Sequence, residues 1–482
     1  MLWKFAALCA LPLLAVSPAQ AAVIALYGAP AYTPGVAGYQ GGGIAGIADD
    51  GTAFGWATKY DATGVSLGTR GIRWNASGAT AELGSISTRA STGGSEAYVI
   101  DVNGSGTAVG RARKFDASGA DVGFRAVRWD ASGTAAVELG NLGTGASGFA
   151  NAAAVAVNRA GTAAGSANKY VSGSTRGERA VRWDASGTAA TELGDIGNTF
   201  GSAYVRANAI NDAGMIVGEA EKWEANGSYK GYRAVRWNPA GTAATELGHL
   251  GTSTGGTTDA YARAVNNAGV AVGYADKYDA SGNNRGVRAV RWDATGTAAT
   301  ELGTLAATPN SLSLNYAYAM NDAGTAVGYT DKSGSSAVRW KAAGTAAQEL
   351  TNLGTNSGST IARANDINSF DFVVGYARTY SPSGQYLDDH AVYWNPDGSV
   401  VDLNTLIDPN SGWVLRTASA ISDSGWIAGH GWFDPDGIGV GQIGYNRLFL
   451  MQVPATAIPE PSAAIAIAGV LGVTRLPRRR RT

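Results

Sequence analysis

Two recurrent side-chain patterns in this chain of 482 residues are of types that bind ligands. The first is a lysine followed by an aromatic residue, and it occurs at Lys59-Tyr60, Lys114-Phe115, Lys169-Tyr170, Lys222-Trp223 and Lys277-Tyr278. Exposed rings at this step would stack on sugar planes, so the five aromatic residues are the candidate ligand-binding residues. The alternative is rim packing, in which the ring covers an edge of the fold and the lysine reaches water.

The second pattern is an arginine ahead of an "AVRW"-type segment, with a glutamate downstream. It occurs at Arg125 and Glu138, Arg179 and Glu192, Arg233 and Glu246, and Arg288 and Glu301. If a four-residue turn joins the two segments, each pair lies directly opposite across a hairpin. The pairs would then form either a ring of ligand-binding charges or one structural ion pair per repeat. Their repetition favours the structural pair.

Signatures of catalysis and metal binding are weak. The segment Asp101-Val-Asn103-Gly-Ser105-Gly106 partly matches a calcium loop but lacks the downstream acidic ligand, so it predicts a turn. The string Gly251-Thr-Ser253-Thr-Gly255 fits a nucleophile elbow without the strand, turn and helix that such an elbow needs. His249, His390 and His430 lack metal-ligand spacing. We therefore predict no catalytic residue, cofactor or metal site.

These residues lie in a repeat of about 55 residues. The glycine that ends an "AVG"-type motif recurs at Gly55, Gly110, Gly165, Gly218, Gly273, Gly328, Gly375 and Gly429. The tryptophan of "RW" recurs at Trp74, Trp129, Trp183, Trp237, Trp292, Trp340 and Trp394, and we assign Phe449 to the eighth place. The chain therefore contains eight units.

Each unit reads as four short strands separated by turn signals. In the fifth unit the segments are "AYARAV", "AVGYADKY", "RAVRW" and "TAATELG", joined by turns such as "NNAG" and "DASG". Asp or Asn at the first turn position and Gly at the fourth favour type I turns. The glycine inside the second strand, as at Gly110, indicates that another backbone passes close to it.

The eighth unit lacks a fourth strand, and residues 22–27 ("AVIALY") have the character of the missing one. We therefore expect an all-β fold for residues 22–454: a β-propeller of eight four-stranded blades closed by an N-terminal strand, with an open β-repeat array as the alternative. In such a blade the short uniform turns lie on one face. The variable loops lie on the other face, which is the candidate working surface.

The two ends predict export. Residues 1–21 have a basic start, an apolar run and a small-x-small cleavage site, as in a secretory signal peptide, and they contain the only cysteine, Cys9. Residues 455–482 contain Pro459-Glu460-Pro461, an apolar stretch at 463–473, and the basic run Arg478, Arg479, Arg480 and Arg481. This tail resembles the PEP-CTERM sorting signal, although its apolar stretch is shorter than the roughly 20 residues that span a bilayer.

The PEP-CTERM resemblance implies partners and a location. These are the export machinery, an exosortase-like processing enzyme, transient membrane anchoring through the tail, and a final place at the cell surface or outside the cell. In residues 22–461, 31 basic residues face 38 acidic ones, a net charge of −7, which argues against a nucleic-acid partner. We expect the body to be a monomer.

The repeats also resemble the HAF family of probable extracellular repeats, named for a His-Ala-Phe motif. The nearest match here is His390-Ala391-Val392, and arginine replaces the histidine in most other units. That family supplies no activity. Our hypothesis is a non-enzymatic surface or matrix protein that binds exopolysaccharide or another surface partner. The alternative is an extracellular polysaccharide hydrolase or lyase, which a cluster of carboxylates, or of Arg and Tyr, at the axial channel would favour.

Overall fold

The computed structural model describes residues 23–26, 38–89, 91–197, 203–305, 312–332, 334–434 and 444–453. These residues form an all-β protein of 32 strands with one 3-10 helix, η1 (Leu403–Leu406). Among them, no helix is both long enough and apolar enough to cross a membrane. The two predicted targeting segments, 1–21 and 455–482, with the residues from Pro459 to Arg481, lie outside the described residues.

The strands fall into sets of four antiparallel neighbours, here called units 1 to 8. The first strands are β2 (Gly38–Ile47), β6 (Ala97–Val102), β10 (Ala152–Val157), β14 (Val205–Ile210), β18 (Ala260–Val265), β22 (Ser313–Met320), β26 (Thr360–Ile367) and β30 (Trp413–Ile421). The second strands are β3 (Ala53–Tyr60), β7 (Ala108–Phe115), β11 (Ala163–Val171), β15 (Ile216–Trp223), β19 (Ala271–Tyr278), β23 (Ala326–Asp331), β27 (Val373–Tyr380) and β31 (Trp426–Phe433).

The third strands are β4 (Ser66–Trp74), β8 (Asp121–Trp129), β12 (Ser174–Trp183), β16 (Tyr229–Trp237), β20 (Asn284–Trp292), β24 (Gly334–Trp340), β28 (Tyr386–Trp394) and β32 (Tyr445–Gln452). The fourth strands are β5 (Thr80–Leu83), β9 (Ala136–Glu138), β13 (Ala190–Glu192), β17 (Ala244–Glu246), β21 (Ala299–Glu301), β25 (Ala347–Glu349), β29 (Val400–Asp402) and, for unit 8, β1 (Val23–Leu26).

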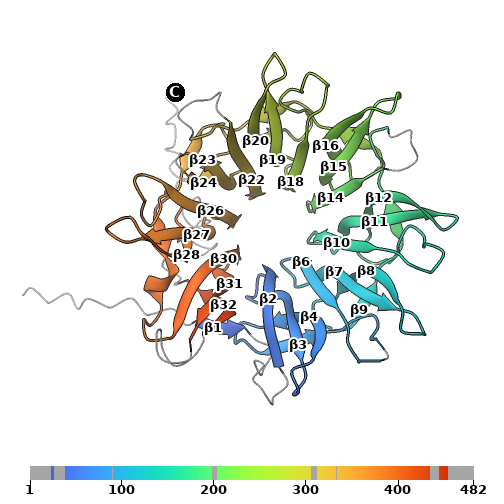
Figure 1. The fold of residues 1–482 in the computed structure, drawn as a ribbon, viewed down its shortest axis with the longest axis horizontal. Helices are drawn as coiled ribbons and strands as arrows, with labels where there is room; N and C mark the ends of the chain where they lie inside the picture. Colours follow the sequence, from blue (N-terminus) through green and yellow to red (C-terminus); the bar gives the residue numbers. More distant parts are fainter. Residues whose placement is uncertain are drawn as a thin grey trace, which may run out of the picture.

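The units are arranged like the blades of a propeller, with the first strand of each nearest the centre (Figure 1). Units 5, 6 and 7 do not stay separate as the repeat predicts, because short parallel pairings such as Gly286 with Ser313 join them into one 12-stranded sheet. The first strands β22 and β26 are eight residues long, against six in units 2 to 5, and their extra residues reach the preceding unit.

The first strand of the chain pairs with the last. In β1, Val23 lies opposite Met451 and Leu26 lies opposite Leu448, so β1 is the fourth strand of unit 8. The register corrects our assignment of Phe449 to the tryptophan position. Met451 pairs with the first residue of the "AVG"-type motif, as tryptophan does in the other units, whereas Phe449 lies two residues earlier, opposite Gly429.

The repeated tryptophans join neighbouring units. Each is fully buried, and from unit 2 to unit 7 its indole nitrogen donates to a backbone carbonyl of the preceding unit, as Trp183 does to Gly140 at 2.9 Å. Trp74 of unit 1 is the exception: its buried Nε1 has no acceptor among the described residues. In the repeat, the residue that aligns with Gly140 in unit 8 is Tyr27, outside the described part of the chain.

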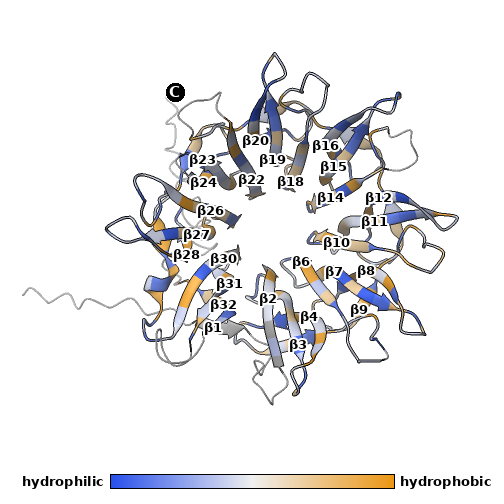
Figure 2. Ribbon diagram, in the orientation of Figure 1, coloured by the Kyte–Doolittle hydropathy of each residue, from blue (hydrophilic) through white to orange (hydrophobic). Residues whose placement is uncertain are grey.

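Apolar side chains pack between the units, and hydrophobic and hydrophilic segments occur within every unit (Figure 2). Units 3 and 4 share a core cluster that includes Leu193, Val205 and Trp237. Units 8 and 1 do the same, since Leu450 packs with Ala53 and Trp74. The core therefore continues from the last unit to the first.

The predicted close approach at the repeated glycine is confirmed. An ideal Cβ on Gly110 would lie 1.9 Å from the carbonyl oxygen of Tyr98, on the neighbouring first strand. The same carbonyl lies at 1.9 or 2.0 Å in every other unit. No side chain fits at this position, because the first strand bulges toward the glycine there.

The predicted turns are also confirmed, and they do more than reverse the chain. The Gly106 amide donates to the Asn103 carbonyl, and the Asn103 side chain accepts from Thr107, as in a type I turn. The Asn103 amide nitrogen also donates to the Asn158 carbonyl of the next unit at 2.8 Å. Asn158 donates in the same way to Asn211, so the turns link successive units on one face.

Candidate functional site

The five aromatic residues that the sequence singles out lie one per unit, at or next to the end of the second strand. Tyr60, Phe115, Tyr170, Trp223 and Tyr278 are all partly buried. Because each belongs to a different unit, they do not converge on one site. Their role as ligand-binding residues stays a prediction.

Their contacts resemble the rim packing that we gave as the alternative. The Tyr170 amide donates to the Leu142 carbonyl at 3.0 Å, and its ring lies against Gly145 in the connection from unit 2. The Trp223 ring lies 5.0 Å from that of Tyr229 within the same unit. Phe115 differs, since it carries the guanidinium of Arg89 at 5.2 Å and lines a pocket of about 320 Å³.

The lysine of each step is held by the repeated glutamate. Lys114 lies 2.8 Å from Glu138, and Glu138 also pairs with Arg125 at 3.5 Å. The same triad occurs in four further units, at Lys59, Glu82 and Arg70, at Lys169, Glu192 and Arg179, at Lys222, Glu246 and Arg233, and at Lys277, Glu301 and Arg288. These lysines therefore serve the fold.

The register of the Arg–Glu pairs differs from our expectation. Glu138 lies opposite Val127, not Arg125, so the pair is diagonal across the hairpin. The fourth strand begins only at Ala136, opposite Trp129, because the connection is longer than four residues. The Arg125 side chain also donates to the Ala150 carbonyl of unit 3 at 2.5 Å, which supports the structural interpretation.

The side chains that differ most between units include those at a β-bulge in the innermost strands. In every unit the register between the first two strands shifts at the same point, leaving one extra residue. These bulge residues are Ala45, Ile100, Val155, Asn208, Arg263, Tyr318, Asn365 and Ser419. Bulges commonly redirect a side chain. Here the bulge residues are apolar in units 1 to 3, large and polar in units 4 to 7, and a small serine in unit 8.

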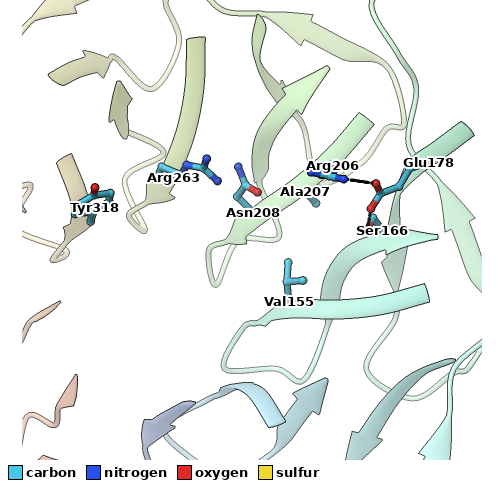
Figure 3. A pocket seen from close by; sticks show the side chains of 8 residues that line it. All are labelled: Val155, Ser166, Glu178, Arg206, Ala207, Asn208, Arg263 and Tyr318. Carbon is cyan, nitrogen blue, oxygen red and sulfur yellow. Dashed lines mark hydrogen bonds and ion pairs between the residues drawn. The ribbon is translucent and has the colours of Figure 1, made fainter. Parts of the chain in front are cut away.

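Four successive bulge residues line one pocket. The side chains of Val155, Asn208, Arg263 and Tyr318 lie at the inner edges of units 3 to 6 (Figure 3) and bound a pocket of about 370 Å³. The rest of its lining is Ser166, Glu178, Arg206 and Ala207. The Tyr318 side chain is 39% exposed, so the pocket includes an accessible aromatic ring.

An arc of aromatic rings holds Arg263 of this pocket and extends to Arg363 of unit 7. The Arg263 guanidinium lies 5.2 Å from the rings of Tyr261 and Tyr274 and donates to the Tyr274 hydroxyl at 2.7 Å. The arc continues through Tyr316 and Tyr329 of unit 6, with ring centroids 4.8 and 5.1 Å apart along the series. Arg363 of unit 7 ends the arc, 4.3 Å from the Tyr329 ring. We call these residues, with Tyr318, the inner arc.

The charged residues in and around the pocket differ in whether they form ion pairs. Arg206 pairs with Glu178 at 2.7 Å, and Ser166 donates to the same carboxylate at 2.5 Å. Glu219 is only 5% exposed, accepts from the Asn208 amide, and has its pKa raised by burial. In the described part of the chain, Arg263 forms no ion pair, whereas Arg206 does.

The Tyr318 hydroxyl lies between the two arginines of the inner arc. Burial raises its pKa, while a hydrogen bond with Tyr329 and the charges of Arg363 and Arg263 oppose that shift. The hydroxyl therefore keeps its proton at neutral pH and can donate to a ligand.

Two buried carboxylates, Asp101 in unit 2 and Asp366 in unit 7, directly follow the bulge residue of their strand. Asp101 accepts from the Val157 amide at 2.8 Å and Asp366 from the Ile421 amide at 3.0 Å, each across a unit boundary. Burial raises the pKa of Asp101 to about 7 and that of Asp366 to about 6. Asp101, the first residue of the partial calcium-loop match, therefore bridges backbones.

The isolated motifs do not assemble into a catalytic group. His249 accepts from the Gly251 amide through Nδ1, and Ser253 accepts from the Thr257 amide within an irregular loop. His390 pairs with Asp402 at 2.6 Å, where most other units have arginine and glutamate. No nucleophile accompanies either histidine among the contacts of the described residues.

Sequence reasoning missed the inner arc because it sought residues that repeat. Its first-strand members lie in segments that differ between units, such as "AYARAV", "NYAYAM" and "TIARANDI", whereas Tyr274 and Tyr329 lie on second strands. The signal in the sequence was a position that changes from unit to unit between two alanines, as at Arg263 and Tyr318.

Comparisons with known proteins give a fold likeness and a family. Among solved structures, puromycin hydrolase is 15% identical with a TM-score of 0.42, over 86% of this chain and 62% of its own. The β-propeller domain of the Trilobed protease from Pyrococcus furiosus is 8% identical with a TM-score of 0.39, over 77% and 97%. The Dos1 propeller is 9% identical with a TM-score of 0.38, over 87% and 94%.

The chain thus spans less than two thirds of the length of puromycin hydrolase. No curated protein matches it. One family model matches twice, over residues 51–255 and 253–471, which together cover most of the sequence. The chain therefore belongs to the DUF3466 family, a family of proteins of unknown function.

Proposed function

We propose that this protein is a non-enzymatic binding protein of the cell surface or extracellular matrix, and that it holds a polysaccharide at the inner arc. The observation that carries the proposal is the bulge ring. One position per unit is freed from strand pairing, and Asn208, Arg263, Tyr318 and Asn365 occupy it in four successive units. Asn208 and Asn365 donate to the Ala262 and Ala418 carbonyls of the next unit, each at 2.8 Å, so Arg263 and Tyr318 are the bulge side chains that remain available for a ligand.

The chemistry of the arc suits a sugar chain. Tyr318 offers a partly exposed ring with a hydroxyl, and Arg263 offers a planar donor fixed by two tyrosines. Aromatic rings and planar guanidinium groups combine apolar contact with directional hydrogen bonds. A polysaccharide presents both apolar ring faces and hydroxyl groups along one chain.

The scaffold of the proposal is a propeller of eight four-stranded blades closed by β1. Three observations support closure. Strand β1 pairs with β32, units 8 and 1 share a core cluster, and Trp74 is fully buried in that cluster. A closed ring has no exposed terminal unit and keeps the inner strands in fixed relation. The open array is the alternative that closure excludes.

Export belongs to the same proposal. Residues 1–21 would be removed as a signal peptide, and the tail 455–482 would be processed by an exosortase-like enzyme after transient membrane anchoring. The HAF and PEP-CTERM resemblances of the sequence support this route. The mature body would then act outside the cell as a monomer.

Binding of the polysaccharide made by the producing strain tests the function. We expect the wild-type body to bind it without turnover, and a Tyr318→Ala, Arg263→Gln double variant to bind about tenfold more weakly or worse. Tyr278→Ala tests the rim aromatic residues predicted from the sequence, and we expect it to bind as the wild type does. Equal binding by the double variant, or a loss only in Tyr278→Ala, would refute the inner arc as the site.

A hydrolase or lyase is the second candidate. Arginine and tyrosine do gather at the inner edge of units 4 to 7, which is the arrangement that favours this alternative. Two carboxylates near Arg206 also differ in environment, Glu178 being ion-paired and Glu219 buried with a raised pKa. Turnover of the polysaccharide that disappears in Glu219→Gln, with binding retained, would establish this candidate and reject the non-enzymatic one.

A further inference from the structure

We infer that the ligand of the inner arc is an anionic saccharide, whose carboxylate or sulfate groups are bound by Arg263 and Arg363. The inference rests on the proposed function for the saccharide. The anionic character of the ligand follows from the arginines alone.

Two positions of the innermost strands carry charges of one sign only. These positions are the bulge residue and the residue two places before it, which faces the second strand. They are charged in three units, and each time the residue is arginine: Arg206, Arg263 and Arg363. Residues 22–461 have a net charge of −7, so these three arginines concentrate positive charge on the axial side of units 4 to 7.

Two of these arginines lack the partner that the scaffold supplies elsewhere. The repeated arginine of the third strand pairs with glutamate in five units, and Arg206 pairs with Glu178. Within the described residues, neither Arg263 nor Arg363 forms an ion pair. A guanidinium with free donors binds carboxylate or sulfate oxygens through two parallel hydrogen bonds.

Both arginines are held ready by tyrosines. Arg263 lies beside Tyr261 and Tyr274, and the Tyr274 hydroxyl accepts from its Nη2 at 2.7 Å. Arg363 lies 4.3 Å from the Tyr329 ring. Tyrosine faces stabilise a cation without neutralising its charge. Little side-chain freedom is then lost when an anion binds.

The nearby acidic groups do not cancel this charge. Glu178 is engaged by Arg206 and Ser166. Glu219 lies on the second strand, is 5% exposed and accepts from Asn208; Arg263 opposes the rise in its pKa, but the two residues form no ion pair among the described residues. Asp366, which follows the bulge of unit 7, accepts from the backbone of unit 8. Among the described residues, Arg263 of unit 5 and Arg363 of unit 7 therefore carry positive charges without an ion pair, in the two units that flank Tyr318.

Three polymers distinguish the charge of the ligand from its sugar backbone: polygalacturonate carries carboxylates, dextran sulfate carries sulfates, and dextran is neutral. We expect the full-length exported body to bind a charged polymer and not dextran, with affinity falling as sodium chloride rises from about 50 to about 500 mM. Arg263→Gln and Arg363→Gln should each weaken this binding about tenfold. Arg159→Gln is the control, because Arg159 is 77% exposed in the turn between β10 and β11 and is not part of the inner arc.

Each outcome decides one claim. Equal binding of dextran and the charged polymers, insensitive to salt and lost in Tyr318→Ala, would overturn the anionic inference and leave the proposed function intact. Binding that Arg159→Gln weakens as much as Arg263→Gln would also overturn it, because attraction would then be spread over the whole surface. If all three polymers and the polysaccharide of the producing strain fail to bind, the proposed function fails as well.

Discussion

Arg288 tests whether the repeated arginines are part of the scaffold. Its side chain is 1% exposed, its Nε lies 3.2 Å from Glu301, and its Nη1 donates to the Ser313 carbonyl of unit 6 at 3.0 Å. Burial lowers the pKa of this arginine, although the group stays charged at any ordinary pH. Glu301 is 34% exposed and also pairs with Lys277 at 2.7 Å.

The size of the effect follows from what each substitution leaves behind. Arg288→Ala leaves a buried carbonyl without a donor, a cavity, and a glutamate with one partner. Removing one member of a buried pair costs about 3 to 5 kcal/mol, and the partial exposure of Glu301 places the expected cost at about 3 kcal/mol. Arg288→Met restores the apolar volume but not the donor, so we expect about 1 to 2 kcal/mol.

Urea unfolding followed by tryptophan fluorescence measures these costs, since each unit from 1 to 7 contains the repeated buried tryptophan. Arg159→Ala is the matched control and should change the stability by less than about 0.5 kcal/mol. The structural reasoning is refuted if Arg288→Ala is as stable as the control. It is also refuted if that variant keeps wild-type stability but loses polysaccharide binding, because the arginine would then serve a ligand.

Three further predictions concern the scaffold. Gly218→Ala should yield little folded protein, because its Cβ would lie 1.9 Å from the Arg206 carbonyl, whereas Gly241→Ala, with open space around it, should fold normally. The raised pKa of Asp101, about 7, means that wild-type stability declines as pH rises from about 4 to about 7, and Asp101→Asn should remove that part of the decline in pH-dependent urea unfolding. Deleting residues 22–27 should lower the melting temperature of the whole body, and unchanged melting would support an open array.

Much of the fold follows from local chemistry. In unit 5, the predicted segments "AYARAV" and "AVGYADKY" coincide with β18 and β19. Their alternation of buried and exposed positions, ended by turn residues, depends only on neighbours in sequence. The close backbone approach at Gly273 could be predicted as well, because a glycine recurs at this place inside the second strand of every unit.

Other features depend on distant residues. The third strand, predicted as "RAVRW", begins four residues earlier, at Asn284 in β20, and the fourth shortens to Ala299–Glu301. The shift of the Arg288–Glu301 pair from opposite to diagonal follows from that pairing. Met451 takes the place that we gave to Phe449, because the register with β31 decides it.

The sequence by itself determined the number of repeats, their turns and the strand that completes the last unit, because each is encoded within one repeat. Only the tertiary structure decided that Asn208, Arg263 and Tyr318 lie together. They are about 55 residues apart, and nothing local marks the bulge that frees them. Packing around a common centre brings one variable position from each unit to the same side, so the candidate site arises from the assembly of the units.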